Sequence, residues 1–203
     1  KAIEEKLLKN GHKIVDATCP FVKKSMEETG IKEGDEVTIK LLEIDQKTGN
    51  ATVTIGRTET ILPKLEQVPG EELSEGDLIK VYVVDVKETE KGPKIMISRT
   101  HSGLVRRLFE TEVPEIFDGT IEIKSVSRQA GARTKIAVYS ANPEIDPVGA
   151  CIGPKGARVN NIVEELGGEK IDIVKYSDDP AVFIGEALSP AKVVSVEIIS
   201  ENP

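Results

Sequence analysis

Apolar and polar positions alternate in short stretches through the first half of the chain. An alternation of period two is typical of strands that bury one face. The stretches that show it cover residues 36–44, 51–55, 58–62, 78–86 and 94–98. Turns rich in Gly, Pro and Asn separate them, and the longest connector, residues 64–75, lies between the third and the fourth. This order predicts an all-β, five-stranded barrel of the OB type.

The second half of the chain mixes helical and strand periods. Helical spacing and helix-start signals indicate helices at residues 102–109, 146–152, 157–166 and 179–187. Alternation indicates strands at residues 120–126, 135–139, 170–176 and, at the end, 192–199. The resulting order, helix-strand-strand-helix-loop-helix-strand before the last helix, predicts an α+β domain.

These patterns predict a multi-domain chain. Residues 34–100 are expected to form the barrel, and residues 101–203 the α+β domain with a flanking helix. Residues 1–33 form an N-terminal segment of different character, for which we expect short helices at residues 1–9 and 18–28. The barrel and the α+β domain are thus the parts on which a functional prediction can be built.

The strongest functional motif is the loop Gly153-Pro154-Lys155-Gly156, which interrupts the two predicted helices. Glycine lets a nucleic-acid backbone approach the main chain without a Cβ clash, and the amides at the following helix start favour a phosphate. Lys155 adds a positive charge, and Arg158 lies about one turn further on. KH domains clamp about four nucleotides with such a loop. The alternative is a tight turn between two helices.

Two further groups of residues complete the predicted nucleic-acid site. An apolar floor for the bases is expected from Val148, Ile152 and Ile162. The cations of the predicted hairpin tip, which could hold the other side of a strand, are Arg128, Arg133 and Lys135. For the tip the alternative is a solvated turn with no ligand.

Charge and composition narrow the choice of function. The chain has a net charge of −8, but residues 124–158 carry 6 basic and 2 acidic side chains and form a local basic segment. Such a segment suffices to attract phosphates because distant charges are screened. Aromatics make up 3% of the chain, and Tyr82 is the only one between residues 35 and 100, so the barrel is expected to be a spacer or a weak RNA contact. His12 and His101 stand alone and are expected to be solvated or structural.

The remaining bulk features predict a cytoplasmic protein that is no enzyme and needs no cofactor or metal. No apolar run approaches the roughly 20 residues of a membrane span, and the first residues lack the apolar core of a secretory signal. Cys19 and Cys151 lie far apart without metal-ligand spacing and are expected to be reduced thiols. No nucleophile is paired with a base, and no Walker loop is present.

The second half of the chain resembles the first KH domain of the NusA family. The segments that carry this resemblance are residues 114–116, Arg128 with 131–138, 146–153, 168–172 and 187–191. Residues 56–63 and 76–82 are similar to the S-one type barrel that precedes that domain in the family. The resemblance implies a KH domain of the bacterial type and an RNA-binding region of a transcription elongation, termination and antitermination factor. Its implied partners are single-stranded nascent RNA and RNA polymerase, the latter through regions mostly absent here, and we expect a monomer.

Two alternatives remain open at this stage. Barrel and KH modules also occur in translation and RNA-decay proteins, which would have ribosome or nuclease partners. Residues 1–24 resemble a segment of the iron–sulfur reductase of the last isoprenoid step, in which Cys19 would match a cluster ligand. That reductase needs three cysteine ligands, and this chain offers only Cys151 in addition. A complete cluster site within one chain is therefore not expected.

Overall fold

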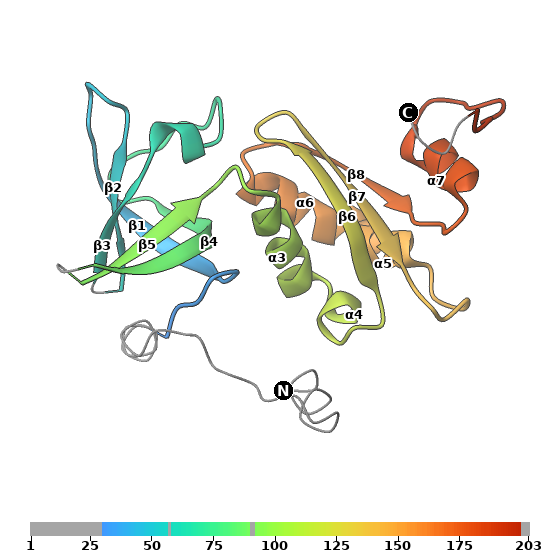
Figure 1. Ribbon diagram of the computed structural model, residues 1–203, viewed down its shortest axis with the longest axis horizontal. Coiled ribbons are helices and arrows are strands. Elements are labelled where there is room, and N and C mark those ends of the chain that lie inside the picture. The colour runs from blue at the N-terminus through green and yellow to red at the C-terminus, as the bar shows by residue number, and fades with distance from the viewer. Residues whose placement is uncertain (1–29, 57, 90–91, 200–203) are drawn as a thin grey trace.

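The computed structural model describes residues 30–199 except 57 and 90–91 (Figure 1). Figure 1 shows a β-barrel at one end of the molecule and an α+β unit at the other. The two helices predicted at residues 1–9 and 18–28, and the segment that resembles the reductase, lie outside the described residues. No described helix is both long enough and apolar enough to cross a bilayer.

The barrel is built from five antiparallel strands, as the alternation predicted. They are β1 (Glu36–Ile44), β2 (Ala51–Ile55), β3 (Thr58–Leu62), β4 (Leu78–Thr89) and β5 (Gly92–Ser98). They pair in the order β3-β2-β1-β4-β5. The two edges approach each other where the Thr60 hydroxyl donates to the Ile95 carbonyl at 2.8 Å, so the barrel is nearly closed. A short helical turn, η1 (Lys64–Glu66), lies in the connector between β3 and β4.

Alternate residues of these strands fill the barrel. Ile39, Leu41, Val53 and Val81 are fully buried, while their neighbours along each strand face outward. The register of β1 against β2 shifts after Leu41, and that of β4 against β5 shifts after Val83. Such bulges bend strands and help a small sheet to close on itself.

The second half forms a KH domain, with α3 leading into the sheet and two helices in the crossover. Its elements are α3 (Ser102–Glu112), α4 (Pro114–Phe117), β6 (Glu122–Gln129), β7 (Arg133–Tyr139), α5 (Pro147–Ile152), α6 (Ala157–Glu165), β8 (Lys170–Lys175) and α7 (Pro180–Ala187). Strands pair in the order β6-β7-β8, with β7 and β8 parallel. The chain passes between these parallel strands through α5 and α6, which pack on the core face of the sheet. The predicted fold class is confirmed.

The strand predicted at residues 192–199 is wrong. The chain there pairs with no strand of the described structure, and Val194 and Ile199 are 100% and 97% exposed. Alternation marks a half-buried strand only where a neighbouring strand and a core are available to it. The sequence also gave no sign of α4, the single turn that begins at Pro114.

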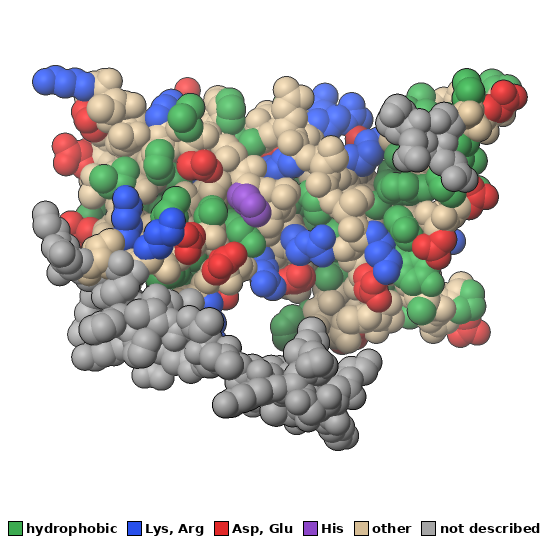
Figure 2. Space-filling model, in the orientation of Figure 1, with side chains coloured by type: hydrophobic (Ala, Val, Ile, Leu, Met, Phe, Trp, Pro, Cys, Tyr) green, Lys and Arg blue, Asp and Glu red, His purple; other side chains and the backbone are tan. Residues whose placement is uncertain are grey.

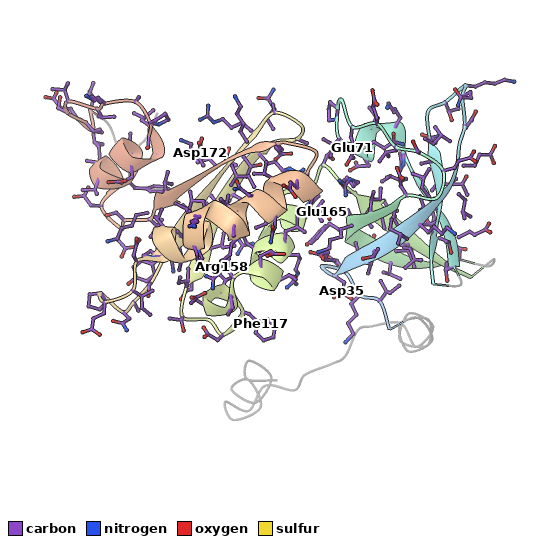
Figure 3. All side chains as sticks on the ribbon, turned by 180° about the vertical axis from the view of Figure 1, so that it is seen from behind. Asp35, Glu71, Phe117, Arg158, Glu165 and Asp172 are labelled. Atoms are coloured by element: carbon purple, nitrogen blue, oxygen red, sulfur yellow. The ribbon has the colours of Figure 1, made fainter. Side chains whose placement is uncertain are left out.

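A buried arginine joins the barrel to the KH domain. Arg99 follows β5 and is fully buried. Its guanidinium pairs with Glu71 of the barrel connector and donates to the Lys80 carbonyl and, at 2.9 Å, to the carbonyl of Glu165 at the end of α6. Figure 3 shows Glu71 and Glu165 on the two sides of this junction. The arrangement fixes the last turn of α6 against the barrel.

Candidate nucleic-acid interface

The Gly-rich loop connects α5 to α6 and holds three left-handed residues. Gly153 and Gly156 have φ of 74° and 78°, and Lys155 has φ of 54°. Lys155 is the one non-glycine residue in the described structure with positive φ, and only a few per cent of such residues adopt it. The loop therefore needs glycine at both ends, and its turn presents Lys155 at the tip.

Lys155 is exposed and makes no ion pair with any carboxylate that the structure describes. The helix behind it, α6, has Gly156 as its N-cap, so no side chain accepts a hydrogen bond from its first turn, although the Ala157 amide donates to the Pro154 carbonyl. Free helix-start amides carry a partial positive charge and bind anions. The loop thus combines an exposed cation with a helix dipole, both of which favour a phosphate.

Arg158 lies beside the loop, as predicted, but most of its contacts are to the protein. A Cβ on Gly153 would come within 2.6 Å of Arg158 Cγ, so the arginine stem packs directly on the loop backbone. Its Nη1 donates to the Ala150 carbonyl at 2.7 Å and to Glu115 of α4 at 3.0 Å. Figure 3 shows Arg158 near the start of α6. Arg158 therefore braces the loop against α5 and α4, and its side chain is only 26% exposed.

The helix α5, which leads into the loop, lies beside β8, and both elements pack apolar side chains on the same core. Val148 is half-buried and Ile152 is 39% exposed, as a base-contacting floor requires. Ile162, by contrast, is 1% exposed in the core, and its predicted place in the floor is wrong because it faces the sheet. The half-buried Ile171 and Ile173 of β8 are better candidates for the apolar floor.

The strand β8 also offers hydrogen-bonding groups that the sequence did not reveal. It lies at the edge of the sheet, next to β7 only. An edge strand presents N–H and C=O groups that have no ladder partner, and these can meet the hydrogen-bonding edges of unpaired bases. The isoleucine alternation of residues 170–175 predicted a strand, but its edge position depends on the pairing order of the whole sheet.

The hairpin tip does not present its cations as predicted. The Arg128 side chain is 2% exposed, and it pairs with the buried Glu169 at 2.9 Å. Lys135 donates to the carbonyls of Ala187 and Ser189 at 2.6 and 2.7 Å and so holds the end of α7. These contacts correct the prediction that Arg128 and Lys135 face RNA, because both side chains already have protein partners. Arg133 stays half-exposed on the surface in an ion pair with Asp172.

The tip is exposed, but it also contacts the barrel. A Cβ on Gly131 would lie 2.5 Å from the Pro69 carbonyl oxygen, so the tip packs against the barrel connector. Arg128 extends the same contact by donating to the His101 carbonyl at 3.0 Å. The hairpin therefore forms part of the junction between barrel and KH domain.

The buried carboxylate of Glu169 should make the fold sensitive to acid. Burial alone raises the pKa of Glu169, but hydrogen bonds from Arg128, Thr134 and the Gly131 amide outweigh it and leave the pKa below its ordinary value of 4.5. A lowered folded-state pKa means that this group stabilises the fold above its unfolded pKa and that the contribution is lost as the pH falls through the folded value. We expect the urea midpoint to fall between about pH 5 and pH 3. Circular dichroism during urea titrations at several pH values measures this, and an unchanged midpoint over that range contradicts it.

Cys151 lies in the core of the KH domain and not at its surface. It is fully buried on α5, and burial raises the pKa of its thiol to about 12. The thiol is therefore protonated at neutral pH, and a protonated thiol is a poor nucleophile and metal ligand. Cys151 fills space between the helices and the sheet.

Several known proteins have similar sequences. Residues 99–176 match the model of the NusA-like first KH domain. The transcription termination/antitermination protein NusA of Halalkalibacterium halodurans is 59% identical over 150 residues, which is 74% of this chain and 39% of that protein. NusA of Bacillus subtilis is 56% identical over 150 residues, covering 74% of this chain and 40% of that protein. NusA of Thermus thermophilus is 47% identical over 170 residues, covering 84% of this chain and 44% of that protein.

These matches extend well beyond the KH domain alone. At 150 to 170 aligned residues they exceed the 78 residues between 99 and 176 and must include part of the barrel. The chain spans about two fifths of the length of these relatives. They give no support to the reductase resemblance of residues 1–24. Over its barrel and KH domain the chain is therefore similar to NusA proteins, and residues 99–176 match a NusA-like first KH domain.

Proposed function

We propose that this chain is the RNA-binding region of a transcription elongation, termination and antitermination factor, and that it holds single-stranded RNA at the loop Gly153–Gly156. The observation that carries the proposal is the exposed Lys155 between Gly153 and Gly156, all three with positive φ, directly before α6. The relatives' names support a role in transcription termination and antitermination, and the KH domain supports RNA as the ligand. The same names favour transcription over translation or RNA decay.

The geometry suggests how one strand is held. A phosphate lies at Lys155 and the first amides of α6, where positive charge and free donors meet. The neighbouring bases lie along Val148 and Ile152 on one side and β8 on the other. A duplex cannot enter this arrangement, because its bases are paired and stacked inside the helix.

We also propose a wider role, which the similarity to NusA proteins supports. RNA polymerase is bound through regions mostly absent from this chain, and the chain acts as a monomer in the cytoplasm. It performs no catalysis: it positions RNA by binding alone. The barrel acts mainly as a spacer between the KH domain and the preceding part of the protein.

The proposal is tested by binding of a short, labelled, A-rich RNA, measured by fluorescence anisotropy. The chain should bind the single strand more tightly than the same RNA in a duplex. The affinity should fall as salt rises, with a slope of roughly −0.7 per neutralised phosphate in a log–log plot. Equal affinity for both forms, or no binding at high micromolar protein, contradicts the proposal.

A further inference from the structure

Two aromatic rings stack at the junction between the barrel and the KH domain. Tyr82 of β4 and His101, which precedes α3, lie with ring centroids 4.5 Å apart and planes within 6° of parallel. Tyr82 is half-buried, while His101 is exposed. Exposed rings that are supported from behind are surfaces on which unpaired bases stack. The proposed function leaves this stack unused.

The orientation of the stack is fixed by the start of α3. The Gly103 amide donates to Nδ1 of His101 at 3.0 Å, so the imidazole caps the helix. A Cβ on Gly103 would lie 2.5 Å from carbons of the Tyr82 ring and 2.8 Å from His101 Nδ1. Glycine at this position therefore lets both rings approach the helix. A ring held in advance loses little entropy when a ligand stacks on it.

Two arginines line a hollow of about 270 Å³ beside the stack. Arg106 donates through Nη1 to the Ile123 carbonyl at 2.8 Å. Arg107 donates through Nε to the Gly34 carbonyl at 2.7 Å and pairs with Glu110 through Nη1. A guanidinium has five N–H donors, so within the described structure both arginines keep donors for an anion. Figure 2 shows a histidine in the middle of one face with basic side chains close by.

We propose that this junction is a second RNA contact, at which one unpaired base stacks on His101 and an adjacent phosphate binds Arg106 and Arg107. The combination of an aromatic ring and guanidinium groups suits any unpaired nucleotide, because every base has a π-face. The inference rests on the proposed function, since the ligand is the same strand beyond the KH loop. The helix α6 follows the loop and ends at Glu165, whose carbonyl accepts from Arg99 between the barrel and the KH domain. Its nine residues span about 13 Å.

The test separates two roles of the His101 side chain, namely base stacking and capping of α3. Asparagine is among the best helix caps, so His101→Asn removes the ring and keeps α3 capped. Two RNAs are compared: one of about five nucleotides, close to the four that a KH loop clamps, and one of about 15 nucleotides, long enough to pass two sites. The variant should bind the long RNA at least about fivefold more weakly, which corresponds to the loss of one base–aromatic stack. It should bind the short RNA as the unchanged protein does, with the same unfolding midpoint.

Photo-crosslinking supplies a readout that a purely structural role would not affect. Long RNA carrying 5-iodouridine should cross-link to the peptides containing Tyr82 or His101, as mapped by mass spectrometry. Unchanged long-RNA affinity in His101→Asn together with no cross-link at these residues overturns the inference. Absence of RNA binding by the unchanged protein overturns both this inference and the proposed function. If long-RNA binding survives charge reversal at Lys155 but falls in His101→Asn, the RNA contact at the junction is supported and the one at the loop is contradicted.

Discussion

Replacing Arg128 by methionine is expected to destabilise the protein by about 3–5 kcal/mol, the usual cost of removing one partner from a buried ion pair. The reason is that Glu169, whose side chain is 0% exposed, would keep its charge without the cation that compensates it. The Thr134 hydroxyl and the Gly131 amide donate to the two oxygens of this carboxylate, and both hydrogen bonds would weaken if it took up a proton. The effect should appear as a lower urea midpoint by circular dichroism.

A matched control is available on the same hairpin. Arg133→Met removes the same length of side chain, but Arg133 is 51% exposed and its partner Asp172 lies at the surface. Exposed pairs contribute little to stability, so the midpoint should hardly move. If Arg128→Met unfolded no more easily than Arg133→Met and instead lost RNA affinity, Arg128 would be an RNA contact after all.

The double change Pro154→Asp, Lys155→Asp is expected to lower RNA affinity about 100-fold. It alters the charge of the loop by three units, and each unit at about 4 Å from a phosphate is worth about 1 kcal/mol in water. At about 1.4 kcal/mol per factor of ten, three units correspond to roughly two orders of magnitude. Aspartate tolerates the left-handed conformation of residue 155 better than most residues do, so the loop should keep its shape. Fluorescence anisotropy measures the loss.

A distant pair of changes separates local binding from overall charge. Gln46→Asp with Lys94→Asp makes the same three-unit change on the barrel, where both side chains are exposed. This control should bind RNA within about threefold of the unchanged protein, because charges beyond roughly 8–10 Å are screened at physiological salt. Equal losses in both double variants would indicate a diffuse electrostatic effect without a site at the loop.

Local pattern was enough to predict most of the fold. Alternation marked all five barrel strands, since each strand buries every second residue. The position of the loop was predictable because glycine permits the positive φ that a tight turn between two helices requires. Secondary structure and turns that depend on residues close together in the chain can thus be predicted from the sequence.

The errors concern contacts between residues far apart in the chain. Arg128 meets Glu169, 41 residues away, and Lys135 meets the carbonyl of Ala187, 52 residues away. A basic segment gives no indication of such partners. Cations that pair within the protein were therefore predicted to bind RNA. The place of β8 in the candidate site was missed for the same reason. Its edge position is set by the pairing order of the whole sheet.

The measurement that tests the central claim most directly is a titration of the isotopically labelled protein with short single-stranded RNA, followed by amide chemical shifts. Binding at the loop predicts that the largest shifts occur at Gly153, Lys155 and Gly156, with smaller ones at Ile171 and Ile173 of β8. Shifts confined to the barrel strands β1 to β5, with the loop amides unmoved, would contradict the account.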